Sequence, residues 1–131
     1  RTLPGVDDDD VDAAIAAALG DLAEHVTIER LLSEPATASS IDTGLYRAIE
    51  AALSARYPGV RVVPVLMPGG TDLRVARRRG GIGYGFGAYD SGASLGDVYA
   101  QLHAHDEHIA LADVRATAGV LHNVTTTYLG A

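Results

Sequence analysis

The 131-residue sequence contains no cysteine, no lysine and no tryptophan, and only one residue each of Met, Phe and Asn. The lack of cysteine excludes a disulfide scaffold and a cysteine-based zinc finger. No apolar run reaches transmembrane length and no signal peptide is visible, so we expect a cytoplasmic protein without membrane contact. The hydrophobic fraction of 47% lies in the normal range of folded domains.

Because lysine is absent, all ten Lys or Arg positions are arginine. The sequence also has 12 Asp and 5 Glu, which gives a formal net charge of −7. This acidic balance disfavours binding to nucleic acid. Every cationic contact must use a planar guanidinium, which can hold a carboxylate with two parallel hydrogen bonds. The sequence starts at Arg1 without a methionine, and we therefore expect a section of a longer protein.

The first 33 residues predict a strand, a helix and a second strand. Four acids at 7–10 precede an apolar stripe of helical spacing, and acids at a helix start complement its dipole. A calcium-binding loop is the alternative for these acids, although no spaced ligand pattern follows. Gly20 is a suitable end for the helix. Residues 26–32 predict the second strand.

The remaining sequence predicts helices alternating with strands. The polar connection at 33–40 is the best domain boundary. We predict helices capped by Ser39 or Ser40 and ending near Tyr57, at 72–79, and at about 111–128, with strands at 60–66 and 82–86 and a loop at 87–96. The apolar faces of the two longer helices are predicted to be Ile41, Leu45, Ile49, Ala52 and Leu53, and Leu111, Val114, Ala118, Leu121 and Tyr128. This alternation indicates an α/β fold with at least partly parallel pairing.

A glycine-rich turn between a predicted strand and a short predicted helix is the first candidate site. Gly69 and Gly70 allow a close backbone approach to a ligand, and Thr71 is a suitable helix cap. Arg74 adds a guanidinium fork for a carboxylate. Together they predict an anion site at the carboxyl end of a strand, where open α/β sheets bind ligands. An ordinary strand-to-helix turn with an exposed arginine is the alternative.

The second candidate is the segment 103–108, His-Ala-His-Asp-Glu-His, which holds three of the five histidines. Imidazole and carboxylate are the usual zinc ligands where cysteine is absent. In an extended segment His103, His105 and Glu107 would share one side. A solvated polar turn is the alternative, and spacing alone does not choose among the histidines. One or two ligands cannot complete a tight site, so the others must come from elsewhere.

Alternating glycines at 80–87 superficially suggest a nucleotide-binding loop. A dinucleotide fingerprint needs a strand, a turn and then a helix, whereas these glycines alternate within a predicted strand. We favour a close backbone approach to a substrate or to a neighbouring loop.

Three stretches occur in the order of motifs known from one family. Residues 1–5 (RTLPG) resemble the end of a "D-x-R-x-x-P-G" motif, residues 68–74 (PGGTDLR) resemble "G-G-T-D-x-R", and residues 102–107 (LHAHDE) resemble "H-x-x-[ND]-E". The sequence thus resembles the dinuclear-zinc hydrolases that include aminoacylase, acetylornithine deacetylase, succinyl-diaminopimelate desuccinylase and related carboxypeptidases and dipeptidases.

The resemblance implies the C-terminal section of such an enzyme. Residues 1–33 would form the end of an α+β lid or dimerisation domain, and residues 34–131 the C-terminal part of an α/β zinc-exopeptidase-like catalytic domain. His103, rather than His105, matches a zinc ligand, and Glu107 matches a supporting residue. The positions that match substrate-binding residues of the family are Arg1, Gly69, Gly70, Thr71 and Arg74.

The implied activity is hydrolysis of amide or peptide bonds in small amino-acid-like substrates, namely N-acyl amino acids or dipeptides. The complete enzyme would hold two zinc ions, with cobalt or manganese as substitutes, and its lid suggests a homodimer. The remaining metal ligands and the general base would lie upstream, so we expect the isolated section to be inactive and nominate no catalytic base.

The rival hypothesis is a non-catalytic α/β module that binds a small anion, without metal, at the turn formed by Gly69, Gly70 and Thr71. An upstream reading frame with an "H-x-D" motif and a later Glu-Glu pair would favour the enzyme.

Overall fold

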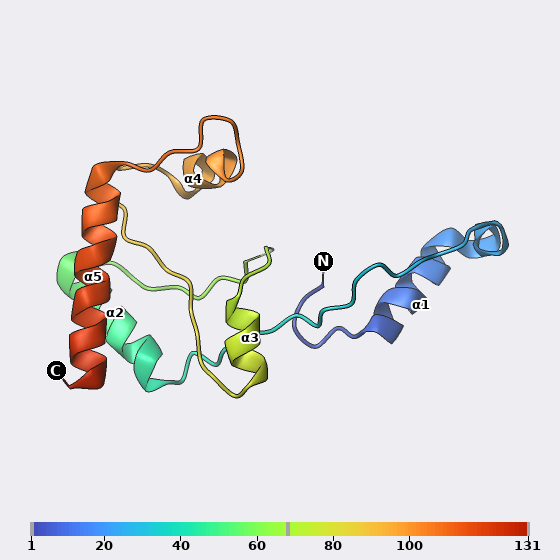
Figure 1. Ribbon diagram of the computed structural model, residues 1–131, viewed down its shortest axis with the longest axis horizontal. Coiled ribbons are helices and arrows are strands. Elements are labelled where there is room, and N and C mark those ends of the chain that lie inside the picture. The colour runs from blue at the N-terminus through green and yellow to red at the C-terminus, as the bar shows by residue number, and fades with distance from the viewer. Residues whose placement is uncertain (1, 68, 131) are drawn as a thin grey trace. The chain divides into compact units, whose positions relative to one another are not determined.

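The computed structural model describes residues 2–67 and 69–130. Within these ranges the chain forms α-helices and one 3-10 helix that are joined by loops (Figure 1). The helices are α1 (Asp8–Leu19), η1 (Gly20–His25), α2 (Gly44–Arg56), α3 (Leu73–Arg78), α4 (Leu95–Gln101) and α5 (Leu111–Leu129). None of the helices in the described ranges is both long and apolar enough to cross a membrane.

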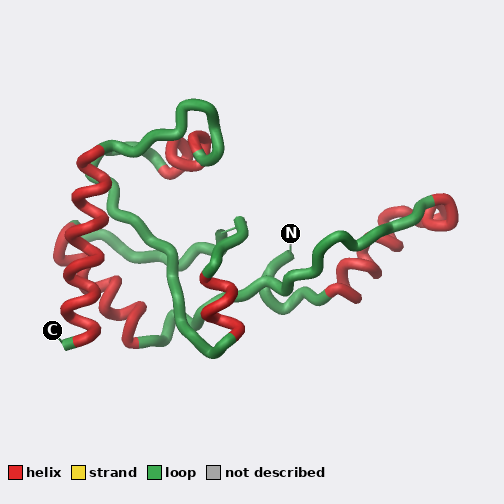
Figure 2. The backbone as a smooth tube through the Cα atoms, viewed as in Figure 1, coloured by secondary structure: helices red, strands yellow, loops and turns green. Residues whose placement is uncertain are grey.

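The predicted α/β fold is wrong, because residues 2–67 and 69–130 contain helices and loops but no strand (Figure 2). The segments predicted as strands lie before α1 and at 26–32, 60–66 and 82–86, and they run as loops and turns where the structure describes them. Their β-branched residues favour an extended backbone, but a strand also needs a neighbouring segment that completes its ladder of hydrogen bonds. No described segment does so, and apolar side chains such as Val65 stay exposed (70%).

The chain packs as two units. Unit 1 comprises Arg1–Ser39 and Leu66–Gly83, and unit 2 comprises Ser40–Val65 and Tyr84–Ala131. The division predicted from the sequence, 1–33 and 34–131, refers to the domains of a longer enzyme and stays a prediction.

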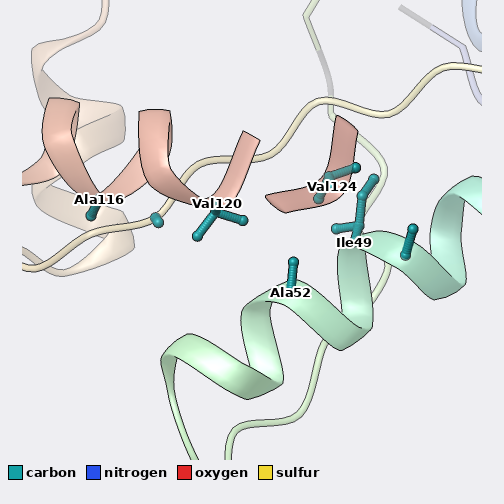
Figure 3. Packing of buried hydrophobic residues seen from close by; sticks show 7 residues of the cluster. Ile49, Ala52, Ala116, Val120 and Val124 are labelled. Atoms are coloured by element: carbon teal, nitrogen blue, oxygen red, sulfur yellow. The ribbon is translucent and has the colours of Figure 1, made fainter. Parts of the chain in front are cut away.

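The apolar core of unit 2 lies between α2 and α5. Figure 3 shows Val120 pointing from α5 toward Ala52 and Ile49 of α2. The buried apolar residues are Ala48, Ile49, Ala52, Ala88, Ala116, Val120 and Val124. The predicted inner face of α2 is therefore confirmed for Ile49 and Ala52. The helix begins later than predicted, because Thr43 is the cap and its hydroxyl accepts a hydrogen bond from Tyr46 N at 3.0 Å.

Helix α5 turns a different face inward from the predicted one. Its buried residues are Asp113, Ala116, Val120 and Val124, whereas the larger Leu111, Val114, Leu121 and Tyr128 are exposed. Asp113 accepts hydrogen bonds from the loop at 90–91, and these contacts bring its face of the helix inward. The small side chains on that face allow the two helices to approach closely.

Unit 1 is held by polar contacts. The acidic run at 7–10 starts α1 as predicted: Asp7 caps the helix in a reciprocal capping box with Asp10, and Gly20 ends it. Arg30 pairs with Asp8 at 3.2 Å and with Asp12 at 2.6 Å. Within the described part of the chain, no group of three or more His, Cys, Asp or Glu side chains lies together so that it could hold a metal ion.

Candidate functional site

The predicted anion-binding turn leads into α3 in unit 1. Asp72 precedes the helix without capping it, and the Thr71 hydroxyl lies 3.4 Å from Leu73 N. The space around Gly70 is open, since an added Cβ would meet no described atom within 4 Å, whereas a Cβ on Gly69 would contact Met67 Cγ at 3.8 Å. The backbone of this turn is thus accessible to a ligand. Pro68, which belongs to the same motif, lies outside the described residues.

The guanidinium of Arg74 is already paired with a carboxylate. Its Nε lies 2.8 Å from Oε2 of Glu34, and Nη1 of Arg78 lies 3.9 Å from Oε1 of the same side chain. The sequence did not lead us to predict either Glu34 or Arg78 as a neighbour of Arg74. The spacing of four residues between Arg74 and Arg78 was a usable signal, because such residues share a helix face.

Two glycines of the 80–87 pattern bring the backbone against α3. A side chain on Gly83 would meet Leu73 at 2.7 Å, and one on Gly81 would meet the carbonyl oxygen of Ala76 at 2.9 Å. The backbone thus makes a close approach as expected, but its partner is helix α3 and not the substrate or neighbouring loop that we predicted. The next helix, α4, begins only at Leu95, so the pattern lacks the helix of a nucleotide-binding loop.

Arg77 ties three segments of unit 1 together. Its Nε donates to the Ser39 hydroxyl at 3.1 Å, its Nη1 contacts the carbonyl and hydroxyl oxygens of Thr37 at 3.3 and 3.4 Å, and its Nη2 donates to Gly83 O at 2.6 Å. Ser39 also accepts from Gly83 N at 3.1 Å. The guanidinium is thereby occupied with structural contacts.

Helix α4, in a region predicted as loop up to residue 96, positions the histidine segment in unit 2. Ser94 and Asp97 form a capping box at its start, and these hydrogen bonds lower the pKa of Asp97. Just after the helix, His103 adopts a left-handed backbone with φ of +62°. Its N–H donates to Glu107 Oε2 at 3.3 Å, so Glu107 supports the turn that presents His103.

The segment 103–108 is a series of turns, so the expected alternation of side chains along an extended backbone does not apply. Ala104 N bonds Gln101 O at 2.9 Å, and Glu107 N bonds Ala104 O at 3.3 Å. His108 Nδ1 lies 2.7 Å from Asp106 O. His103 and His105 are exposed.

The described residues do not by themselves fit a complete metal site. Across 2–67 and 69–130, no three His, Cys, Asp or Glu side chains lie together so that they could hold an ion. His103 can offer one imidazole. Arg74 belongs to unit 1 and His103 to unit 2. Arg1, the other predicted substrate-binding arginine, lies outside the described residues.

A buried carboxylate joins α5 to the preceding loop in unit 2. Asp113 accepts hydrogen bonds from Asp90 N (2.7 Å), Ser91 N (2.8 Å) and Ser91 Oγ (2.7 Å). The Ser91 hydroxyl is the main cause of a lowered Asp113 pKa, and burial opposes it. Asp90 in turn pairs with Arg56 and accepts from Tyr57 Oη at 2.7 Å, which raises the pKa of Tyr57.

A hollow of about 340 Å³ lies beside this network and contains none of the predicted site residues. It is lined by Leu53, Tyr57, Val60, Arg61, Val62, Gly87, Ala88 and Tyr89.

The profile of peptidase family M20/M25/M40 matches residues 3–127, a range that includes the glycine turn, Arg74, His103 and Glu107. No curated protein and no solved structure matches the chain.

Proposed function

Because this chain belongs to peptidase family M20/M25/M40, we propose that it serves the hydrolysis of amide or peptide bonds in N-acyl amino acids or dipeptides. The match over residues 3–127 is the observation that supports this proposal most strongly. It supports a peptidase, hence a hydrolase, in general terms. The substrate class is our own inference, and it rests on the resemblance of the glycine turn and Arg74 to substrate-binding motifs.

In this proposal Arg74 binds the free carboxylate of the substrate, with Gly69, Gly70 and Thr71 lining the same site and Arg1 in a similar role. The salt bridge from Arg74 to Glu34 supports it, because a carboxylate fits against this guanidinium. The open space around Gly70 leaves room for a ligand.

The family generally binds zinc or other metals. We propose that His103 supplies one ligand to zinc and that Glu107 positions His103 through its backbone. One imidazole cannot hold a catalytic metal, which needs about three protein ligands. The other ligands and the general base therefore belong, in this proposal, to parts of the enzyme outside these 131 residues. A homodimer formed through the lid is part of the same proposal.

The test uses the complete enzyme with His103 replaced by Ala and, separately, by Asn, which tolerates the left-handed backbone. We expect both variants to lose bound zinc and to hydrolyse N-acyl amino acids and dipeptides more than about 100-fold more slowly, since even outer-shell changes cost 10–100-fold. His105→Ala is the matched control and should keep both properties. Unchanged zinc content and activity in the His103 variants would refute the assignment.

The 131-residue chain alone should show no hydrolase activity and should lose zinc on dialysis, because it supplies a single proposed ligand. Zinc measured at one equivalent per chain after dialysis would contradict this expectation.

A further inference from the structure

Two arginines on α3 face one carboxylate. Arg74 and Arg78 are four residues apart and so share a face of the helix. Glu34 presents Oε2 to Arg74 at 2.8 Å and Oε1 to Arg78 at 3.9 Å. Each oxygen of the carboxylate thus faces a different guanidinium, which is how a free carboxylate would be held between them.

Glu34 is kept beside α3 by contacts that do not involve this pair of arginines. Arg77 bonds Thr37 and Ser39, and Ser39 bonds Gly83 N. These bonds fix the segment that follows Glu34 against α3 and against Gly83 in the loop after this helix. The carboxylate is therefore held at high local concentration over Arg74 and Arg78.

The ion pair is nonetheless open to exchange. The side chains of Arg74, Arg78 and Glu34 are 36%, 42% and 32% exposed. Pairs this accessible to water are weak, because solvent screens them and ordering long side chains costs entropy. A carboxylate from solution can compete for the same two guanidinium groups.

We propose that Arg74 and Arg78 form a carboxylate clamp and that Glu34 occupies it as an internal competitor that a substrate carboxylate must displace. This inference rests on the proposed role of Arg74, and it adds Arg78 and Glu34 to the substrate site. The affinity for a carboxylate ligand is thereby reduced by Glu34, whereas a ligand without that charge is unaffected.

The test titrates the 131-residue chain with N-acetyl-L-alanine and follows the ¹H–¹⁵N signals of the arginine Nε groups. Glu34→Gln should lower Kd about two- to fivefold, the range expected for an exposed pair. It should also shift the Arg74 Nε signal in the free chain. Glu29→Gln, which removes an exposed carboxylate from the same unit, is the control of equal charge and should change neither. Arg78→Gln in the Glu34→Gln background should weaken binding again.

N-acetyl-L-alanine methylamide, which lacks the carboxylate, should bind Glu34→Gln and the unsubstituted chain equally. An unchanged Kd for N-acetyl-L-alanine in Glu34→Gln, with binding lost in Arg74→Gln, would overturn the competitor while leaving the role of Arg74 intact. Absence of binding in every variant would overturn the clamp together with that role. The hydrolase assignment is judged separately by the His103 variants.

Discussion

Different forces stabilise the interior of unit 2 and that of unit 1. Every buried side chain in the described residues belongs to unit 2, where α2 and α5 enclose an apolar core. In unit 1 the buried residue is Gly83, which has no side chain to bury, and the unit depends on ion pairs and hydrogen bonds such as those of Arg77. Salt does not screen apolar burial, whereas it screens exposed ion pairs and weakens them. The two units should therefore respond differently to substitution, pH and salt.

Among the substitutions that distinguish the two units, Val120→Ala is expected to cause the largest loss of stability. Val120 is 1% exposed, and truncating it loses buried apolar surface and leaves a cavity. We expect the free energy of unfolding of unit 2 to fall by about 2 kcal/mol, measured by urea-dependent amide exchange of α2 and α5. Val114→Ala, on the same helix but 43% exposed, should cost less than about 0.5 kcal/mol. Equal losses would show that the core lies elsewhere.

The second effect is acid sensitivity of unit 2. The pKa of Asp113 is lowered in the folded chain, so its contribution is complete above the unfolded pKa of about 3.9 and is lost as the pH falls through the folded value. We expect the stability of unit 2 to decline below about pH 4. Asp113→Asn should be less stable at pH 7 and should decline less steeply in acid. Asp106→Asn, an exposed control, should retain the full decline in an acid titration followed by circular dichroism.

The third effect concerns unit 1, where Arg77→Lys removes the planar fork that reaches Ser39 and Gly83. A loss of about 1 kcal/mol should make the Gly83 amide exchange about fivefold faster. Arg79→Lys is the matched control, because no described residue bonds its side chain. Unit 2 amides should not change in either variant, and a change there would break the separation of the two units.

Salt should have the smallest effect. Raising NaCl to about 0.5 M should screen the pair of Arg74 with Glu34 and speed amide exchange in α3 by less than about threefold. Glu34→Gln should abolish this response. Amides of α2 and α5 serve as the internal reference, and an equal salt response there would contradict an apolar origin of unit 2 stability.

Local signals predicted the ends of α1 well. The acids before this helix and Gly20 after it act within a few residues of the ends that they mark. The same kind of signal was overlooked at α4, where Ser94 and Asp97 have the spacing of a capping box.

Features that depend on distant residues were not predictable in this way. The runs at 60–66 and 82–86 have strand composition, but a strand exists only with a partner, and no described segment provides one. The inward face of α5 was missed because the Asp113 contacts with Asp90 and Ser91 override the larger apolar residues.

The candidate site likewise has features that nearby sequence predicts and features that depend on distant residues. The motif positions Gly69, Gly70, Thr71, Arg74, His103 and Glu107 could be chosen from sequence order, and their roles stay predictions. Glu34, far from Arg74 in the sequence, gave no signal, since nothing in a single exposed glutamate identifies its partner.

The left-handed backbone at His103 restricts which amino acids a saturation library could accept there. Asn, Asp and Gly adopt a φ of +62° at little cost, whereas Val, Ile and Thr would be strained by their branched Cβ before any question of chemistry arises. With the zinc role proposed for His103, position 103 would select amino acids twice, first by backbone conformation and then by what the side chain can bind. In a library scored separately for folding and for catalysis, Asn and Gly at this position should pass the first screen and fail the second.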